Sequence, residues 1–161
     1  MVGLDAKEYE RLVNLYLGSI YRVALNGCKR STDAEDVVQN TFLKLWERQD
    51  AFTNDEYARK WLIRVAVNEC KSLWRTAWKR KTVYLEESGR EPKFSTSEKS
   101  DLYDAVCELP VKYRQIVHLY YFEEYSVKEI AQLMKLSETA VQTRLLRARQ
   151  KLKEALKEAW K

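Results

Sequence analysis

Glycine and proline are scarce in this chain of 161 residues, which holds four glycines and two prolines. Tight turns and short strands depend heavily on both residue types, so their scarcity argues against an all-β architecture. Charged residues make up 33% of the chain and hydrophobic residues 45%, a balance that is typical of amphipathic helices. The composition therefore predicts an all-α fold.

The chain also has few of the residues on which most catalytic and metal sites depend. His118 is its only histidine, and it falls in a tyrosine-rich helical run, where a partly buried structural role is expected. No metal-binding cluster, glycine-rich phosphate loop or nucleophile with an adjacent base is apparent. We therefore expect a non-enzymatic protein with no cofactor, no metal ion and no small-molecule substrate.

Cysteines and long apolar runs are equally limited. Cys28, Cys70 and Cys107 are odd in number and far apart in the sequence, so we expect buried, reduced thiols and a cytoplasmic location. No signal peptide and no apolar run of about 18 residues is apparent, so insertion into a membrane is not expected.

Charge is present in both signs but is unevenly distributed. The chain has 29 basic and 24 acidic residues, and its net charge is +5. Residues 71–81 and residues 144–153 are basic runs without an acid, whereas residues 33–36 are acidic. Two separate basic runs predict two contacts with a polyanion.

Apolar periodicity divides the chain into two helical domains. Three helices are predicted at about residues 9–24, 32–48 and 57–79, which together make a first domain over residues 1–81. Thr32 and Glu35 have the spacing of a capping box at the start of the second helix. The apolar period disappears over residues 82–100, which we interpret as a flexible linker.

The second predicted domain, residues 101–161, ends in two helices joined by a short turn. Ser126 and Glu129 form a second capping-box pattern, and a break at Leu136 and Ser137 separates that helix from the basic final one. A capped helix, a short turn and a basic helix predict a helix-turn-helix, the motif that places its second helix in the major groove of DNA.

The outward face of the final helix has the residues of a DNA-recognition surface. One narrow face, which should pack inward, consists of Val141, Leu145, Ala148 and Leu152. Arginine and glutamine can pair with base edges, and threonine or leucine can contact a thymine methyl group. The alternative is a solvated helix in which the exposed leucine is incidental. The outward and flanking residues are Gln142, Thr143, Arg144, Leu146, Arg147, Arg149, Gln150 and Lys151.

The third helix predicts a second nucleic-acid surface. Trp61 and Trp78 border the outer stripe, and the residues that should face inward are Leu62, Ala66, Cys70, Leu73 and Ala77. Cations for phosphates, an amide for a base edge and rings for stacking are what an opened strand requires. The alternative is that both tryptophans belong to the core and the cations are merely solvated. The stripe consists of Arg64, Asn68, Lys71 and Arg75.

The second helix has a different outward face. Acidic and amide groups surround an exposed leucine there, with Trp46 at the boundary, while Val37, Val38, Thr41, Phe42 and Leu45 should face inward. Acidic groups repel phosphates, so this face predicts a protein-binding patch. The patch consists of Asp36, Gln39, Asn40, Leu43 and Glu47.

These segments match a known family in four places along the chain. The matching segments are residues 33–39, residues 61–68, Leu109-Pro110 and the helix pair from Ser126 to Arg149. Over nearly its whole length the chain resembles the small alternative bacterial sigma factors of the extracytoplasmic-function (ECF) group of the sigma-70 family. The resemblance implies a factor that binds core RNA polymerase and directs it to specific promoters by recognising the minus-10 and minus-35 elements and helping to open the duplex.

The resemblance also implies roles for the two domains. Residues 1–81 would be sigma region 2, in which Asp36, Gln39 and Asn40 match positions that contact the clamp helices of the β′ subunit. The loop at residues 50–55, with Phe52, and the helix bearing Asn68 would capture the non-template strand of the minus-10 element by flipping a base.

Residues 101–161 would be sigma region 4, a winged-helix-like helix-turn-helix that also meets the β flap of the polymerase. Gln142, Thr143, Leu146 and Arg147 match its minus-35 contacts. Several relatives carry an aromatic residue in place of Leu146 and a basic residue in place of Gln142, so their minus-35 sequence does not transfer. The candidate phosphate contacts are Arg114, Ser126, Lys128, Arg144 and Arg149.

Two further expectations follow from the resemblance. Such factors are commonly held inactive by an anti-sigma protein, sometimes at the membrane, and exposed apolar residues such as Leu43 and Leu146 suit that masking. The alternative function is a stand-alone helix-turn-helix regulator that acts without recruiting polymerase. The patch on the second helix distinguishes the two, because a plain regulator has no need for it.

Overall fold

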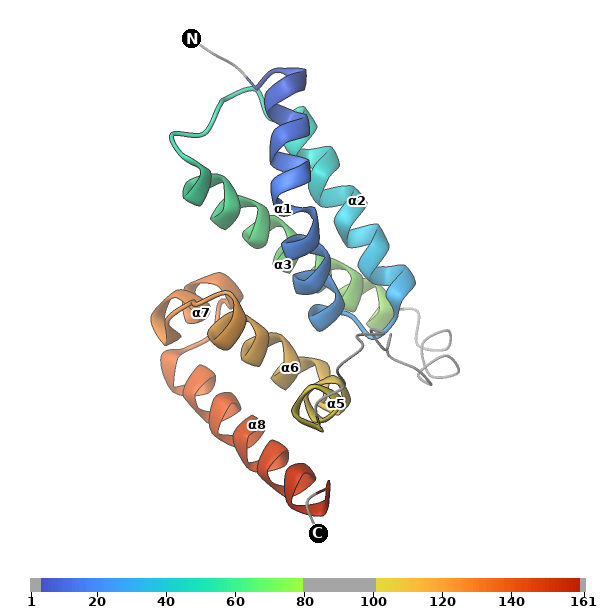
Figure 1. The fold of residues 1–161 in the computed structure, drawn as a ribbon, viewed down its shortest axis with the longest axis vertical. Helices are drawn as coiled ribbons and strands as arrows, with labels where there is room; N and C mark the ends of the chain where they lie inside the picture. The colour runs from blue at the N-terminus through green and yellow to red at the C-terminus, as the bar shows by residue number, and fades with distance from the viewer. Residues whose placement is uncertain (1–3, 80–100, 160–161) are drawn as a thin grey trace. The chain divides into compact units, whose positions relative to one another are not determined.

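The computed structural model describes residues 4–79 and 101–159, and the chain divides into two compact units, Met1–Ser88 and Gly89–Lys161. Every regular element in the described part is a helix, which confirms the all-α prediction (Figure 1). The predicted linker at residues 82–100 lies outside the described residues, so its flexibility and bounds stay predictions. No helix in the described residues is long and apolar enough to cross a membrane.

Unit 1 is a bundle of three helices, each of which packs against the other two (Figure 1). Its core includes Leu12, Ile20, Leu45, Leu62 and Ile63, which are almost completely inaccessible to solvent. The five inward residues predicted for the second helix are all buried, as expected from their 3.6-residue period. The helices are α1 (Ala6–Gly27), α2 (Ser31–Glu47) and α3 (Asp55–Lys79).

The predicted capping box at the start of α2 is wrong. The helix begins at Ser31 with Arg30 as its N-cap, so Thr32 already lies in the first turn. Arg30 makes no side-chain cap bond; its guanidinium instead pairs with the buried Asp33 carboxylate, with Nε and Oδ2 3.4 Å apart. An acidic side chain in the first turn favours the helix start through the backbone dipole.

The fold brings two cysteines together that the sequence separates by 42 positions. The Sγ atoms of Cys28 and Cys70 lie 3.7 Å apart in the core of unit 1. Hydrogen bonding to Cys28 and burial raise the pKa of Cys70 well above its ordinary value. Burial was predicted for all three cysteines; it is confirmed for Cys28 and Cys70, whereas Cys107 is only half-buried.

Unit 2 is built around its last helix, against which α5, α6 and α7 pack. His118 is buried and its ring stacks on Phe122 with a centroid distance of 5.4 Å, in line with the structural role predicted for it. Residues 101–159, the described part of this unit, contain no strand. The elements are α5 (Asp101–Glu108), α6 (Val111–Val117), the π-helical turn η1 (His118–Phe122), α7 (Val127–Met134) and α8 (Glu138–Ala159).

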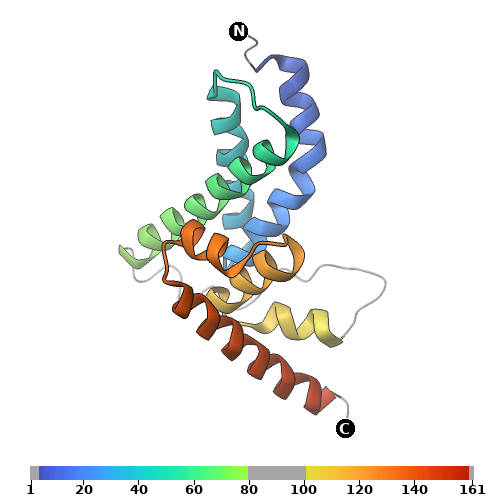
Figure 2. The ribbon, with the colours of Figure 1, turned by 90° about the vertical axis from the view of Figure 1, so that its left-hand side faces the viewer.

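The helix-turn-helix is confirmed in the pair α7 and α8, the orange and red helices of Figure 2. The second capping box is present: the Glu129 N–H donates to Ser126 Oγ at 3.0 Å, and the Ser126 N–H donates to Glu129 Oε1 at 3.1 Å. Lys135, with φ of 57°, ends α7 in the left-handed region, and the Ser137 hydroxyl then accepts the Ala140 N–H at the start of α8.

Candidate nucleic-acid and protein interfaces

The outward face of α2 carries an exposed apolar pair. Leu43 is 54% exposed and Trp46 is 59% exposed, so the tryptophan belongs to the patch and not merely to its boundary. The Trp46 ring meets the Tyr9 ring of α1 edge-on with a centroid distance of 5.0 Å, which fixes its position. The predicted polar residues around the pair, Asp36, Gln39, Asn40 and Glu47, are all exposed.

A carboxylate of α3 holds one side of this patch. The Lys44 ammonium lies 2.5 Å from Glu69 Oε1, and the Asn40 amide donates to Glu69 Oε2 at 3.5 Å. The Glu69 side chain is only 13% exposed, so its charge is anchored between the two helices. Sequence periodicity did not single out Glu69, because its partners lie 25 and 29 positions earlier in the chain.

The loop between α2 and α3, residues 48–54, gathers aromatic rings around an arginine. The guanidinium carbon of Arg48 lies 4.1 Å from the Phe52 ring centre and 5.2 Å from the Trp61 ring centre. The rings of Phe52 and Trp61 lie 5.6 Å apart, and that of Tyr57, 57% exposed, lies 6.3 Å from Phe52. Sequence reasoning found Phe52 and Trp61 but missed Arg48, which stands where the helical period ends.

Unit 1 also anchors the far end of this loop. Arg11 of α1 donates to both carboxylate oxygens of Asp55, at 2.7 and 3.0 Å, and to both oxygens of Glu8. The Tyr16 hydroxyl donates to the Asp55 carbonyl at 2.9 Å, and Asn54 Oδ1 accepts the Tyr57 N–H and so caps α3. The hydrogen bonds from Arg11 lower the pKa of both carboxyl groups.

The outer stripe of α3 continues from these rings toward the C-terminal end of that helix. Arg64, Asn68 and Arg75 are exposed and Lys71 is half-buried. Of the predicted inward residues, Leu62, Ala66 and Cys70 are buried, Leu73 is only half-buried, and the Ala77 side chain lies outside the described residues. Asn68 is two turns after Trp61, and therefore the stripe and the loop aromatics share one side of the helix. The Trp78 side chain lies outside the described residues.

The outward face of α8 is arranged as its period predicts. Val141, Leu145 and Ala148 are buried against the unit, Leu152 is only half-buried, and Leu146 is 54% exposed on the other side. The other predicted base-contacting residues, Gln142, Arg147 and Gln150, are exposed, and Thr143 is half-buried. Among the candidate phosphate contacts, Ser126, Lys128 and Arg149 are exposed and Arg144 is half-buried.

Tyrosines from the helices beneath α8 hold two of its arginines, a feature that the sequence analysis did not identify. Arg149 Nε donates to the Tyr121 hydroxyl at 2.7 Å, and its guanidinium carbon lies 5.7 Å from that ring centre. Burial raises the pKa of Tyr113, but a hydrogen bond from Arg147 and the charge of Lys112 outweigh it and lower that pKa overall.

Arg114 does not share this exposure. It is 3% exposed, and its Nη1 donates to the Cys107 carbonyl at 3.1 Å. A phosphate contact needs a guanidinium at the surface, so this placement does not support the role expected for Arg114. Its hydrogen bond to the main chain of α5 turns the guanidinium toward the protein and away from solvent.

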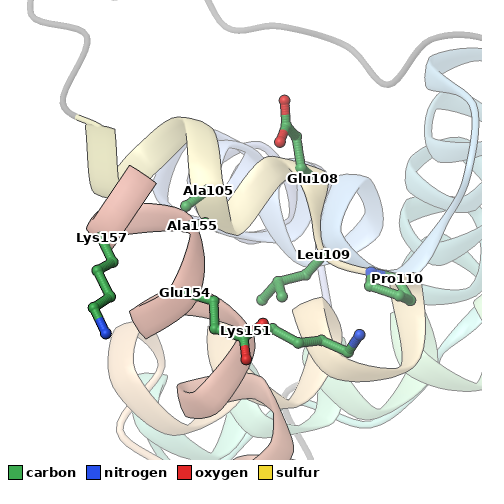
Figure 3. Close-up of a pocket in the computed structure, with 8 residues that line it drawn as sticks. All are labelled: Ala105, Glu108, Leu109, Pro110, Lys151, Glu154, Ala155 and Lys157. Carbon is green, nitrogen blue, oxygen red and sulfur yellow. The ribbon is translucent and has the colours of Figure 1, made fainter. Parts of the chain in front are cut away.

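A groove of about 620 Å³ lies between α5 and the end of α8 (Figure 3). Ala105, Leu109 and Ala155 supply its apolar surface, and the charged residues Glu108, Lys151, Glu154 and Lys157 line it as well. Both helices are part of unit 2, and an apolar groove with charged edges is a common form of protein-docking surface.

Two family models match the chain. Sigma-70 region 2 matches residues 12–80, and Sigma-70, region 4 matches residues 99–152. The chain is 28% identical over 151 residues to the ECF RNA polymerase sigma factor SigM of Bacillus subtilis, covering 89% of this chain and 92% of the relative. It is 29% identical over 133 residues to the RNA polymerase sigma factor SigV of the same organism, covering 80% and 78%.

Solved structures have the same fold. The sigma factor RpoE of Bartonella quintana, in complex with the anti-sigma factor NepR, matches with a TM-score of 0.68 and 24% identity, covering 94% of this chain and 98% of that one. CnrH, in complex with the cytosolic domain of CnrY, matches with a TM-score of 0.60 and 26% identity, covering 96% and 90%.

Proposed function

The chain belongs to the ECF group of the sigma-70 family of RNA polymerase sigma factors, and we propose that its two units divide promoter recognition between them. As an alternative sigma factor it directs RNA polymerase to promoters. In our proposal, residues 1–81 act as region 2 at the minus-10 element, and residues 101–161 act as region 4 at the minus-35 element.

The exposed face of α2 is the main structural support for the proposal that this protein recruits polymerase. Leu43 and Trp46 form an apolar centre, and Asp36, Gln39, Asn40 and Glu47 surround it with acidic and amide groups. Such a face repels nucleic acid and suits a protein partner. We assign it to the clamp helices of the β′ subunit, a role that a stand-alone regulator does not need.

This assignment is tested by the double substitution Asp36→Ala with Gln39→Ala. Both side chains are exposed, so the fold should survive while binding to core polymerase weakens. Fluorescence anisotropy with labelled protein measures the affinity. Glu10→Ala with Asn14→Ala, on the exposed side of α1, is the matched control and should bind like the parent. Unchanged binding of a well-folded Asp36/Gln39 variant would contradict the assignment.

The α2–α3 loop and the α3 stripe are proposed to take up the opened minus-10 strand. Phe52 and Trp61 supply rings on which a flipped base can stack, and Arg64, Asn68, Lys71 and Arg75 supply cations and an amide along the same helix. Unstacking a base costs a few kcal/mol, about the amount that stacking on one or two rings returns.

The outward face of α8 is proposed to recognise the minus-35 element as duplex DNA. Gln142, Thr143, Leu146, Arg147 and Gln150 would face the major groove, with hydrogen-bonding groups for base edges and one leucine for a thymine methyl group. Phosphate contacts would come from Ser126, Lys128, Arg144 and Arg149, which lie at the start of α7 or on the flanks of α8.

Further partners are proposed on the same reasoning. The groove between α5 and α8 is a candidate site for the β flap, because it combines an apolar surface with charged residues. Two similar solved structures are complexes with a protein partner, which is an anti-sigma factor in one and the cytosolic domain of CnrY in the other. They support a regulatory protein partner, which we propose to be an anti-sigma factor. We place the protein in the cytoplasm, held at the membrane when that partner is, and assign it no catalytic activity and no cofactor.

Run-off transcription tests the function as a whole. Bacterial core polymerase is supplied with a pool of promoter fragments, with and without this protein. Transcripts that appear only with the protein, from specific fragments, are the expected result and identify its promoter. DNA binding without recruitment of core polymerase or initiation would instead favour the stand-alone helix-turn-helix regulator.

A further inference from the structure

Arg48 is the cation of unit 1 whose surroundings differ most from those of the α3 stripe. It ends α2, it is half-buried, and its guanidinium lies against two aromatic rings. We propose that Arg48 is a positioning residue, which holds the α2–α3 loop in the shape that presents Phe52 and Trp61 to an opened DNA strand. This inference rests on the proposed minus-10 role of the loop.

The contacts of Arg48 fix the loop at its first turn. Its main-chain N–H donates to the Leu45 carbonyl at 3.1 Å, and its Nε donates to the Asp50 carbonyl at 2.9 Å. The side chain therefore closes a turn around residue 49. Because Nε is directed at the main chain, the plane of the guanidinium is fixed as well.

The same guanidinium then fixes the rings. Its distances of 4.1 Å to Phe52 and 5.2 Å to Trp61 are within the range of cation–π contact, and the two rings also meet each other at 5.6 Å. Phe52 lies in a segment with no regular hydrogen-bonded element of its own, so its position depends on these contacts. Loss of Arg48 should let the Phe52 ring move while α2 and α3 remain folded.

The far end of the loop is held in a different way. There Arg11 pairs with Asp55, but both side chains are about half exposed, and exposed ion pairs contribute little to stability. Arg48 is itself half-buried, and it adds contacts with two rings to its hydrogen bond with the main chain. A loop that is already ordered loses less conformational entropy when it binds, which is how Arg48 would strengthen strand binding.

A direct phosphate contact is the competing role for Arg48, and a lysine substitution separates the two. Lysine keeps the positive charge, but it lacks the planar group that stacks on two rings and the Nε that reaches the main chain. As a positioning residue, Arg48→Lys and Arg48→Ala should both weaken strand binding by roughly tenfold and leave its salt dependence unchanged. As a phosphate contact, lysine should preserve most of the affinity, and alanine should reduce the salt slope by about 0.7.

The binding experiment uses the full chain with core polymerase. The probe is a single-stranded non-template oligonucleotide from the promoter identified by run-off transcription, titrated at several salt concentrations. Arg22→Ala, at an exposed arginine of α1, is the matched control and should leave affinity unchanged. Phe52→Ala and Asn68→Ala test the proposed surface itself; if neither weakens binding, the minus-10 assignment is wrong whatever Arg48 does.

Amide hydrogen exchange of the free full-length protein tests Arg48 without DNA. In Arg48→Lys, exchange should accelerate by roughly tenfold at residues 49–54 and remain unchanged in α1, α2 and α3. Unchanged exchange in the loop overturns the inference, even if strand binding falls. Faster loop exchange, with equal losses of strand affinity in the lysine and alanine variants, supports it.

Discussion

Helices α3 and α8 look alike as sequences but present their cations in different surroundings. Both are long, at 25 and 22 residues, with an apolar inner face and a basic outer face. Beside α3, the half-buried rings of Phe52 and Trp61 pack against each other and against Arg48, next to the cationic stripe. Around α8, the buried ring of Tyr113 and the half-exposed ring of Tyr121 come from the preceding helices, and their hydroxyl groups engage Arg147 and Arg149.

The placement of the aromatic rings determines which form of DNA each helix suits. Rings at the surface can stack with bases, which is useful only where bases are unstacked. Tyrosine hydroxyl groups that bind the arginines of α8 instead restrain those arginines, and they leave an outer face of amides, cations and one leucine for the edges of paired bases. Two helices with the same period therefore suit single-stranded and duplex DNA respectively.

Substitution of one leucine on each helix should give the largest difference in the free energy of unfolding between α3 and α8. Leu62 of α3 is completely buried, so Leu62→Ala should reduce the free energy of unfolding by about 2–5 kcal/mol. Leu146 of α8 is 54% exposed, so Leu146→Ala should change the free energy of unfolding by less than about 0.5 kcal/mol while weakening duplex binding. Urea unfolding followed by circular dichroism measures both. A large loss of stability in Leu146→Ala would mean that this leucine belongs to the core.

The arginines of α8 should separate base contacts from phosphate contacts. Arg147→Ala should reduce binding to a promoter with its preferred minus-35 element by roughly 1–3 kcal/mol and relax specificity at one position. Arg149→Ala should weaken binding to all upstream sequences equally and reduce the salt slope by about 1. Gel-shift titrations on matched and altered promoters measure both. Uniform losses from Arg147→Ala would mark it as a phosphate contact.

Substitutions at the starts of α7 and α2 should have an intermediate effect on the free energy of unfolding. Ser126→Ala removes one half of the capping box of α7 and should reduce the free energy of unfolding by about 1 kcal/mol. Thr32→Ala should change it by less than about 0.5 kcal/mol, because Thr32 is exposed within the first turn of α2 and caps nothing. Urea unfolding compares the two variants directly. Equal losses would mean that Thr32 stabilises α2 in some other way.

The smallest effect on stability is expected from the exposed ion pairs of Arg11 with Glu8 and Asp55, and it depends on pH. The hydrogen bonds of Arg11 lower the pKa of Asp55 and Glu8 in the folded state. At a pH above the pKa values of the unfolded chain, which are about 4, both groups are ionised and stabilise the folded state. That contribution disappears as the pH falls through the lowered folded values. In Arg11→Ala, NMR titration should find both pKa values raised, with little change in stability at neutral pH. An unchanged Asp55 pKa would exclude the ion pair in solution.

Several features of this protein were predictable because they depend on local period and on short motifs. The inward faces of α2, α3 and α8, the capping box at Ser126 and the helix-turn-helix all follow from residues within a few turns of one another. The same local reasoning failed at Thr32, where the helix began two residues earlier than the motif suggested.

The sequence by itself determined which residues face outward on each helix, since a 3.6-residue period sorts side chains regardless of what the helix packs against. Only the tertiary structure decided what each outward residue touches. It buried Arg114, paired Glu69 with Lys44, and set Arg48 against Trp61. It also brought Cys28 to Cys70 across 42 positions. These contacts depend on how whole helices pack in three dimensions, which a pattern with a range of a few residues cannot specify.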